Sequence, residues 1–229
     1  MTLNDLAKKF DHTLLKATAV EADIRKLCDE ARTYRFASVC VNPCWVPLCS
    51  QLLQGSEVLV CTVIGFPLGA NATAVKVQEA ALAVKEGAGE VDMVLNVGWA
   101  LEGRWDAVEA DILRVRQAAG SVPLKVILEI CYLSDDQVVR ACQAASAAGA
   151  VFVKTSTGFG TAGATPDHVR LMKKTIKTGM KVKASGGIRT LSDTLILLEA
   201  GADRIGASAS VAIVKEFQGE QSAGVPIGY

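Results

Sequence analysis

The chain has 229 residues, of which 50% are hydrophobic and 21% are charged, and its 24 basic residues balance its 24 acidic residues. The hydrophobic fraction excludes a disordered chain, and the zero net charge argues against nucleic acid or an anionic membrane as a partner. The sequence contains no run of about 18 apolar residues, which a membrane-spanning helix would need. The length fits one large domain or two small ones.

The N-terminal segment and the cysteines indicate a reducing compartment. Residues 1–10 carry an aspartate and two lysines and lack the apolar stretch of a signal peptide. The chain has 7 cysteines, an odd number, and free thiols in the cytoplasm are the simplest interpretation. It has 2 histidines, and neither lies near a cysteine in the sequence, so we expect no metal site.

Apolar segments of strand length alternate with helical patterns along the whole chain. The expected strands cover residues 11–14, 36–41, 58–64, 90–96, 124–130, 151–155, 181–185 and 204–207. Apolar residues at three- and four-residue spacing predict helices between the strands. These helices cover residues 21–34, 72–86, 105–118, 135–148, 166–178 and 191–200, and a further helix follows the last strand.

Capping and turn residues support this alternation. Thr165 and Pro166 are typical of a helix start, and residues 134–137 match a capping box. The Ala-Gly-Ala segments at 148–150 and 200–202 are typical of a helix end that leads into a strand. Eight alternations predict an α/β protein with a single (β/α)8 TIM barrel over residues 1–217, followed by a mobile tail over residues 218–229. A doubly wound open sheet is the alternative, but no Gly-x-Gly-x-x-Gly segment follows the first strand.

The strands of a barrel have one set of side chains facing the helices and an alternate set facing the barrel axis. On the central strands, one set is apolar. The other set contains five polar residues, Cys40, Asp92, Lys125, Lys154 and Lys183. We therefore expect these five side chains to converge inside the barrel.

The lysines of this set need an explanation, because burying an isolated ammonium group is costly. For one lysine, a structural ion pair or a side chain that reaches solvent is the more common explanation. Three lysines on adjacent strands favour amine catalysis instead. Neighbouring positive charge and a dry site both favour the free amine that attacks a carbonyl. The resulting iminium withdraws electrons, so an adjacent C–C bond can break or form without a metal.

Glycine-rich segments follow the last three expected strands, at residues 155–160, 184–189 and 206–210. Glycine lets a backbone amide approach a ligand oxygen, and a helix N-terminus favours an anion. In many barrels the loops after strands seven and eight bind phosphate. An ordinary turn would explain one such segment, whereas three at one edge of the barrel favour a phosphate site.

Eight short motifs between Asp11 and about Phe217 occur in a fixed order. They are DHTLLK (11–16), SVCVNP (38–43), GFPLG (65–69), EVDMVLN (90–96), KVILE (125–129), VFVKTSTG (151–158), KASGGIR (183–189) and RIGAS (204–208). Together they resemble the motifs of the deoxyribose-phosphate aldolase family. The resemblance implies a class I aldolase, without a cofactor, that reversibly cleaves 2-deoxy-D-ribose 5-phosphate to acetaldehyde and D-glyceraldehyde 3-phosphate.

By position, the resemblance also implies a role for each matching residue. Lys154 would form the Schiff base, and Lys183 beside it would keep it deprotonated. Asp92, with a water molecule, would move protons in the carbinolamine and enamine steps, and Lys125 would hold Asp92 in place. Thr157 would orient water or substrate. The phosphate would be held by Gly158, Gly186, Gly187 and Ser208.

Three positions need separate comment. Cys40 would lie in the pocket without a required role.

Many relatives have a second serine after position 208, where this chain has Ala209. The backbone amide remains, so phosphate binding should survive. Tyr229 could reach the mouth of the barrel and assist proton transfer at the enamine carbon, and an incidental C-terminal residue is the equal alternative.

Other functions stay open at this stage. Another Schiff-base enzyme such as a transaldolase-like aldolase, or a sugar-phosphate isomerase, would fit the same barrel. A sugar-phosphate-binding barrel without catalysis would also fit, although Lys154, Lys183 and Asp92 argue against it. The expected partners are a sugar phosphate and an aldehyde, not nucleic acid or a membrane, and a homodimer and a homotetramer both stay open. The resemblance implies cytoplasmic deoxyribonucleotide and carbohydrate catabolism.

Overall fold

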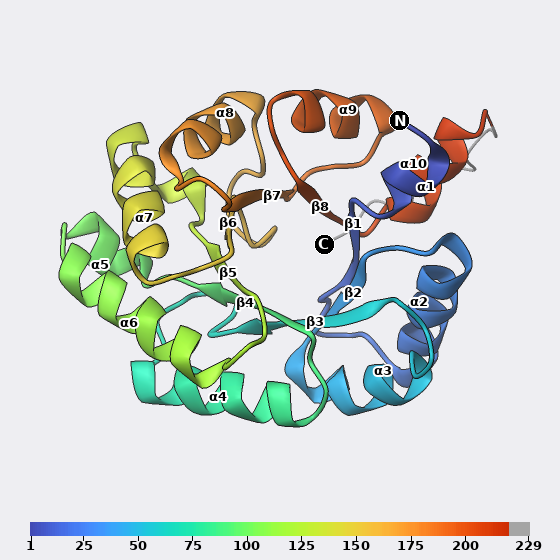
Figure 1. The fold of residues 1–229 in the computed structure, drawn as a ribbon, viewed down its shortest axis with the longest axis horizontal. Helices are drawn as coiled ribbons and strands as arrows, with labels where there is room; N and C mark the ends of the chain where they lie inside the picture. The colour runs from blue at the N-terminus through green and yellow to red at the C-terminus, as the bar shows by residue number, and fades with distance from the viewer. Residues whose placement is uncertain (220–229) are drawn as a thin grey trace.

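The computed structural model describes residues 1–219. Eight parallel strands pair in sequence order, and the last pairs with the first, so the sheet closes into a barrel (Figure 1). The strands are β1 Phe10–Leu14, β2 Ser38–Val41, β3 Leu59–Ile64, β4 Glu90–Val94, β5 Leu124–Ile127, β6 Phe152–Lys154, β7 Lys181–Ser185 and β8 Arg204–Ala207. The predicted (β/α)8 barrel is confirmed.

Helices surround the ring of strands on the outside (Figure 1). Those predicted from periodicity are α2 Glu21–Tyr34, α4 Thr73–Lys85, α6 Trp105–Ala118, α7 Asp135–Ala147, α8 Pro166–Thr175 and α9 Leu191–Glu199, with α10 Ser210–Phe217 after the last strand. Short elements that the sequence did not predict are α1 Leu3–Ala7, α3 Val46–Leu52, α5 Val97–Leu101 and the 3-10 turns Pro43–Trp45 and Ile130–Tyr132. None of the helices within residues 1–219 is long and apolar enough to cross a membrane.

The capping signals act as predicted. The Ser134 hydroxyl accepts the Gln137 backbone N–H at 3.3 Å, and the Gln137 side chain accepts the Ser134 N–H at 2.9 Å. This reciprocal capping box begins α7. Thr165 accepts the backbone N–H of His168 at 3.2 Å and so caps α8. Gly149, at φ +78°, has the left-handed conformation expected where a helix gives way to a strand.

Several strand boundaries were predicted wrongly, and local contacts explain the differences. β2 begins at Ser38 rather than 36, because the Phe36 N–H donates to a carbonyl of α2 at 3.0 Å. β4 ends at Val94 rather than 96, because Asn96 caps α5 by accepting the Trp99 N–H at 3.1 Å. β5 ends at Ile127 rather than 130, because Glu129 adopts a left-handed φ of 54°. The chain therefore leaves the sheet earlier at the carboxyl ends of β4 and β5.

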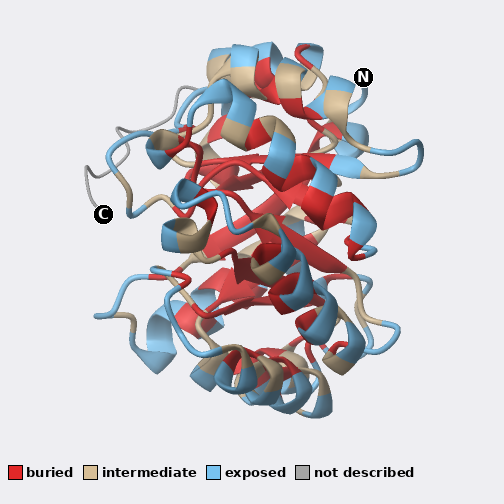
Figure 2. Cartoon of the chain, turned by 90° about the vertical axis from the view of Figure 1, so that its left-hand side faces the viewer, coloured by how far each residue is buried: buried red, intermediate tan, exposed pale blue. Residues whose placement is uncertain are grey.

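The hydrophobic core lies between the barrel and the helices (Figure 2). Outward-facing residues of the strands, such as Val91, Met93 and Val126, are fully buried. Burying one such side chain contributes about 1.5–3 kcal/mol. Ala80 and Ala83 of α4 are buried in the same core, and their small side chains let the helix pack close to the sheet. Because this apolar layer lies outside the barrel, the inward-facing residues of the strands can be polar.

Candidate active site

The five side chains predicted to converge do meet inside the barrel. Lys154 Nζ lies 2.9 Å from Asp92 Oδ2, and Lys183 Nζ lies 2.7 Å from the same oxygen. Lys125 Nζ lies 2.9 Å from Asp92 Oδ1. Cys40 Sγ lies within 4.8 Å of the Asp92 carboxylate. One carboxylate on β4 thus gathers lysines from β5, β6 and β7.

Solvent hardly reaches this cluster. Asp92, Lys125 and Lys183 are 0% exposed, whereas Lys154 is 2% exposed. Lys154 is also the last residue of β6, at the carboxyl end of the strand. A molecule that enters the barrel from this end would reach the amine of Lys154 before the deeper lysines.

Three charged residues that the sequence reasoning did not select complete the network. Arg204 donates to Asp11 Oδ1 at 2.5 Å and to Glu90 Oε1 at 3.1 Å. Glu90 accepts from Lys125 Nζ at 2.7 Å, and Asp11 Oδ2 lies 2.5 Å from Lys183 Nζ. Alternation could have found Glu90, because it lies two residues before Asp92 on the same face of β4.

Ion pairing outweighs burial in setting the pKa values of Asp92 and Asp11, the two carboxyls that contact Lys183. Burial alone raises the pKa of Asp92, but Lys125, Lys154 and Lys183 together hold that pKa well below its ordinary value. Burial likewise opposes ionisation of Asp11, and Lys183, Lys125 and Arg204 lower its pKa. Both groups are therefore carboxylates at neutral pH.

The same balance between burial and ion pairing sets the charge of Lys183 and Lys125. Burial lowers the pKa of Lys183, but Asp11 and Asp92 outweigh burial and raise it above the ordinary lysine value. Burial also opposes the charge of Lys125, and Asp92 leads the groups that raise its pKa well above the ordinary value. Lys125 and Lys183 are therefore ammonium ions at neutral pH.

The lowered pKa values of Asp11 and Asp92 predict a loss of stability in acid. In the unfolded chain these carboxyls take up protons at about pH 3.9, whereas in the native protein they stay ionised to lower pH. Their contribution is complete above the unfolded pKa and is lost as the pH falls toward the folded pKa. Urea unfolding from neutral pH to about pH 3 should show this decline, and Asp11→Asn should flatten it. The exposed Asp136→Asn is the control; an equal slope in both variants would contradict the prediction.

Thr157 is held by an acidic residue that the sequence reasoning missed. Its backbone N–H donates to Glu129 Oε1 at 3.1 Å, and its hydroxyl donates to Glu129 Oε2. The Phe159 N–H donates to Thr157 Oγ1 at 2.9 Å. Glu129 is 3% exposed, and its left-handed backbone turns it back toward the loop after β6. In the sequence, Glu129 alternates with Lys125 along the expected strand 124–130 and ends the KVILE motif.

The glycine-rich loops after β6 and β7 lie against each other. Gly158 and Gly186 have φ values of +88° and +87°. A Cβ on Gly186 would lie 3.0 Å from Gly163 Cα, 3.4 Å from Ser156 Cβ and 3.7 Å from Gly158 Cα. Side chains larger than hydrogen would therefore push the two loops apart.

The other predicted phosphate residues lie beside two pockets at this end of the barrel. Gly187 and Gly186 line a pocket of about 240 Å³ near the start of α9. Ser208 is exposed after β8 and lines a pocket of about 300 Å³ with Thr13 and Lys16. Gly158, Gly186 and Gly187 are thus brought together, with Ser208 on the loop of the neighbouring strand. Tyr229 lies outside the described residues, and its predicted role stays a prediction.

Two aromatic rings join the loops after β3 and β6. The rings of Phe66 and Phe159 meet edge to face, with centroids 5.3 Å apart. Phe66 also packs against a small apolar cluster inside the barrel that contains Cys40, Cys61 and Val63. The site therefore has an apolar side beside the lysines.

Sulfur and carboxylate atoms inside the barrel lie close enough to suggest a metal site. Within residues 1–219, two groups have ligand atoms within 4.8 Å of one another: Cys40, Cys61 and Asp92, and Asp11, Cys61 and Glu90. The ammonium groups of Lys125 and Lys183 already contact these carboxylates. A metal cation would have to displace them, so the donor set fits ion pairs better than a metal ion.

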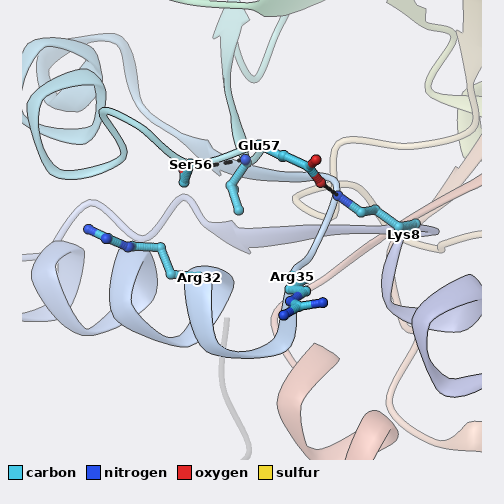
Figure 3. Close-up of a pocket in the computed structure, with 6 residues that line it drawn as sticks. Lys8, Arg32, Arg35, Ser56 and Glu57 are labelled. Atoms are coloured by element: carbon cyan, nitrogen blue, oxygen red, sulfur yellow. Dashed lines mark hydrogen bonds and ion pairs between the residues drawn. The ribbon is translucent and has the colours of Figure 1, made fainter.

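A separate pocket of about 430 Å³ lies at the opposite end of the barrel (Figure 3). Its lining residues are Lys8, Arg32, Arg35, Ser56, Glu57 and Val58. Lys8 precedes β1, Arg35 precedes β2 and Val58 precedes β3, so this is the amino-terminal end of the strands. Lys8 pairs with Glu57 at 3.0 Å (Figure 3). Since catalytic groups of such barrels lie at the carboxyl ends, this pocket is not the candidate active site.

Comparisons with known proteins identify the family of the chain. A model of the DeoC/LacD family aldolases matches residues 6–224. The chain is 57% identical to a deoxyribose-phosphate aldolase of Lysinibacillus sphaericus, over 92% of this chain and 95% of the relative. It is 56% identical to the deoxyribose-phosphate aldolase of Carboxydothermus hydrogenoformans, over 92% of this chain and 94% of that protein. The tetrameric deoxyribose phosphate aldolase of Aeropyrum pernix superposes with a TM-score of 0.89 at 37% identity, over 95% of this chain and 92% of that one. The chain therefore belongs to the DeoC/LacD family of aldolases.

Proposed function

We propose that the protein is a class I aldolase that reversibly cleaves 2-deoxy-D-ribose 5-phosphate to acetaldehyde and D-glyceraldehyde 3-phosphate. The observation that carries the proposal is the amine of Lys154 at the carboxyl end of β6, which lies 2.9 Å from Asp92 Oδ2. The names of the relatives that cover more than nine-tenths of the chain supply the substrate.

The charges around Lys154 balance without a contribution from Lys154 itself. The three carboxylates of the network are Asp11, Glu90 and Asp92, and the cations beside them are Lys125, Lys183 and Arg204. These six charges cancel. Schiff-base chemistry needs an uncharged amine, and a site whose other charges already cancel accommodates such an amine without an unpaired charge. The Lys183 side chain contacts the same Asp92 oxygen as Lys154.

The first half of the reaction breaks the C–C bond. The Lys154 amine attacks the aldehyde carbon of the open-chain sugar, and loss of water from the carbinolamine gives an iminium. Asp92, acting with a water molecule, moves the protons of these steps. The iminium accepts the electron pair of the bond between C2 and C3, and the C3 hydroxyl loses its proton. Glyceraldehyde 3-phosphate leaves, and the two-carbon unit stays on Lys154 as an enamine.

The second half releases acetaldehyde. The enamine carbon takes up a proton, and water hydrolyses the new iminium to free Lys154. Thr157, held by Glu129, orients water or substrate at the mouth. The apolar side formed by Phe66 and Phe159 limits the entry of water. Because the iminium is the electron sink, we propose that no metal or other cofactor takes part.

The phosphate group is proposed to lie between the loops after β7 and β8, where backbone amides of Gly186, Gly187 and Ser208 can donate to it. Gly186→Ala would insert a Cβ 3.0 Å from Gly163 Cα. We expect KM for the phosphorylated sugar to rise by about tenfold, the cost of one lost hydrogen bond to a charged group. Unphosphorylated 2-deoxyribose should be cleaved as before.

The matched control for this variant is Gly179→Ala. Gly179 also has a positive φ, +90°, but a Cβ there would have no atom within 4 Å. The two variants thus share backbone strain and differ in their effect on the loops. Steady-state kinetics with both sugars checks the prediction. An equal loss with both sugars in Gly186→Ala would contradict a phosphate role.

The proposed function is tested by product analysis. The purified protein should convert 2-deoxyribose 5-phosphate into equal amounts of acetaldehyde and glyceraldehyde 3-phosphate, with a rate unchanged by a chelator. An isomerase would instead give an isomeric sugar phosphate without acetaldehyde. A transaldolase-like enzyme would turn over only when a second aldose is supplied. Either of those results, or a rate abolished by the chelator, would contradict the proposal.

We further propose that residues 1–217 form the catalytic domain and that residues 218–229 form a tail whose Tyr229 assists proton transfer. The proposed activity implies cytoplasmic catabolism of deoxyribonucleotides and carbohydrates, with a sugar phosphate and an aldehyde as partners rather than nucleic acid or a membrane. A homodimer and a homotetramer are the proposed assemblies, and the Aeropyrum pernix relative is a tetramer.

A further inference from the structure

Cys40 and Cys61 form a pair of thiols inside the barrel that the proposed mechanism does not use. The two residues are register partners on the adjacent strands β2 and β3, and both are 0% exposed. Their sulfur atoms lie within 4.8 Å of each other and of the Asp92 carboxylate. We propose that this pair is an oxidation site, where a peroxide joins the two thiols in a disulfide and so reversibly stops turnover.

The strands already hold the two cysteines at a suitable spacing. Neighbouring strands lie about 4.8 Å apart, and disulfides join residues whose Cα atoms are about 4.4–6.8 Å apart. Both side chains point to the barrel axis, because they belong to the same alternate set as Asp92. Closing the bond therefore needs a rotation of side chains and no change of strand register.

The surroundings give the two thiols different roles. The hydrogen bond from Cys61 lowers the pKa of Cys40, and Lys183 adds to this effect against burial. Burial and the hydrogen bond to Cys40 raise the pKa of Cys61 well above its ordinary value, and Asp92 adds to this. Cys40 therefore loses its proton more readily and is the sulfur that reacts first, and Cys61 is the thiol that closes the bond. The barrel must admit an aldehyde as far as Lys154, and hydrogen peroxide is no larger.

The reaction balances with hydrogen peroxide as the oxidant. The Cys40 thiolate attacks one peroxide oxygen, the O–O bond breaks, and hydroxide leaves, which gives a sulfenic acid on Cys40. The Cys61 sulfur then attacks the Cys40 sulfur, and the sulfenic oxygen leaves as water with the proton of the Cys61 thiol. The proton that Cys40 lost on ionising joins the hydroxide, so two thiols are oxidised by two electrons and one peroxide becomes two water molecules. A dithiol such as dithiothreitol reverses the change by exchange.

The disulfide would disturb Asp92. In the reduced protein, Cys61 Sγ donates to Asp92 Oδ1 at 3.1 Å and accepts from Lys125 Nζ at 3.4 Å. Oxidation removes the S–H donor and draws the sulfur toward Cys40. A displaced catalytic group of this kind can cost about 10²-fold in rate, and that is the loss we expect. This effect on turnover rests on the proposed aldolase function, whereas formation of the disulfide does not.

A second pair of thiols provides an internal control. Cys28 of α2 and Cys49 of α3 are also buried, and they hydrogen-bond to each other. They lie in the core between the helices and the sheet, away from Asp92. Cys49→Ser removes this pair and leaves Cys40 and Cys61 in place.

The test follows peroxide titration with three measurements on the full chain: peptide mapping after alkylation, cleavage of 2-deoxyribose 5-phosphate, and recovery with dithiothreitol. In the unaltered chain and in Cys49→Ser, the Cys40–Cys61 linked peptide should accumulate in step with an about 10²-fold loss of activity. Dithiothreitol should reverse both changes. In Cys61→Ser, no linked peptide should form, and Cys40 should instead gain oxygen. Activity of this variant is compared with that of the same variant before treatment.

Two results would overturn the proposal. One is a protein in which peroxide oxidises other cysteines but gives no Cys40–Cys61 link. The other is a protein that carries the link and keeps its activity, or that loses activity only when Cys49 is present. If the untreated protein cleaves no sugar phosphate, the proposed function fails, and the linked peptide still decides whether the oxidation site exists.

Discussion

Lys154→Met is expected to lower kcat/KM for cleavage of 2-deoxyribose 5-phosphate by about 10⁴-fold or more, in the range that loss of a covalent nucleophile costs other enzymes. Methionine fills a similar volume but has no amine, so no iminium can form. The fold should survive, because the other six charges of the network cancel without Lys154. Steady-state kinetics with far-UV circular dichroism checks both statements.

The control for this variant is Lys174→Met. Lys174 is an exposed residue of α8, so the same chemical change there should leave kcat/KM unaltered. Residual activity of Lys154→Met within about tenfold of the unaltered chain would show that another group carries the reaction.

Asp92→Asn is expected to lower kcat by about 10²- to 10⁴-fold, the usual cost of losing a group that transfers protons. The amide keeps the shape of the carboxylate but loses its charge. The lysines that now share Asp92 Oδ2, Lys154 and Lys183, would then face each other without a counter-charge. The variant should also lose about 3–5 kcal/mol of unfolding free energy, as expected when one partner of a buried ion pair is removed.

Asp111→Asn separates the two effects. Asp111 is 2% exposed and lies 2.7 Å from Lys76 Nζ, but it belongs to α6 outside the barrel. Its substitution should also lower the free energy of unfolding by about 3–5 kcal/mol and should leave kcat of the folded protein unchanged. Urea unfolding and kcat below the unfolding transition are the measurements. If the two variants lose kcat equally, the effect of Asp92→Asn is one of stability alone.

The strongest sequence predictions concerned features with a strict period. Alternation along β4 to β7 placed Asp92, Lys125, Lys154 and Lys183 on the inner face of the barrel, and the structure joins all four within 2.9 Å contacts. The longer helices, which show clear three- and four-residue spacing, were found for the same reason. α2 and α6 have their predicted bounds.

Features that depend on contacts distant in sequence were missed. Asp11 and Arg204 are 193 positions apart in the chain, and alternation within one strand does not show which residues of β1 and β8 pair across the barrel. Glu129 adopts a left-handed backbone conformation, which glutamate rarely takes. The alternation pattern therefore predicted that β5 would continue through this residue. Helices α1 and α5 have 5 residues each, less than two turns, and give no periodic signal.

Trapping of the covalent intermediate tests whether Lys154 forms the Schiff base. The protein is incubated with acetaldehyde, treated with borohydride and digested, and the modified peptide is sequenced by mass spectrometry. We expect an N-ethyl-lysine at Lys154, and no such adduct in Lys154→Met. A reduced adduct on Lys183 or Lys125, or an unmodified Lys154 in protein that cleaves the substrate, would contradict the account.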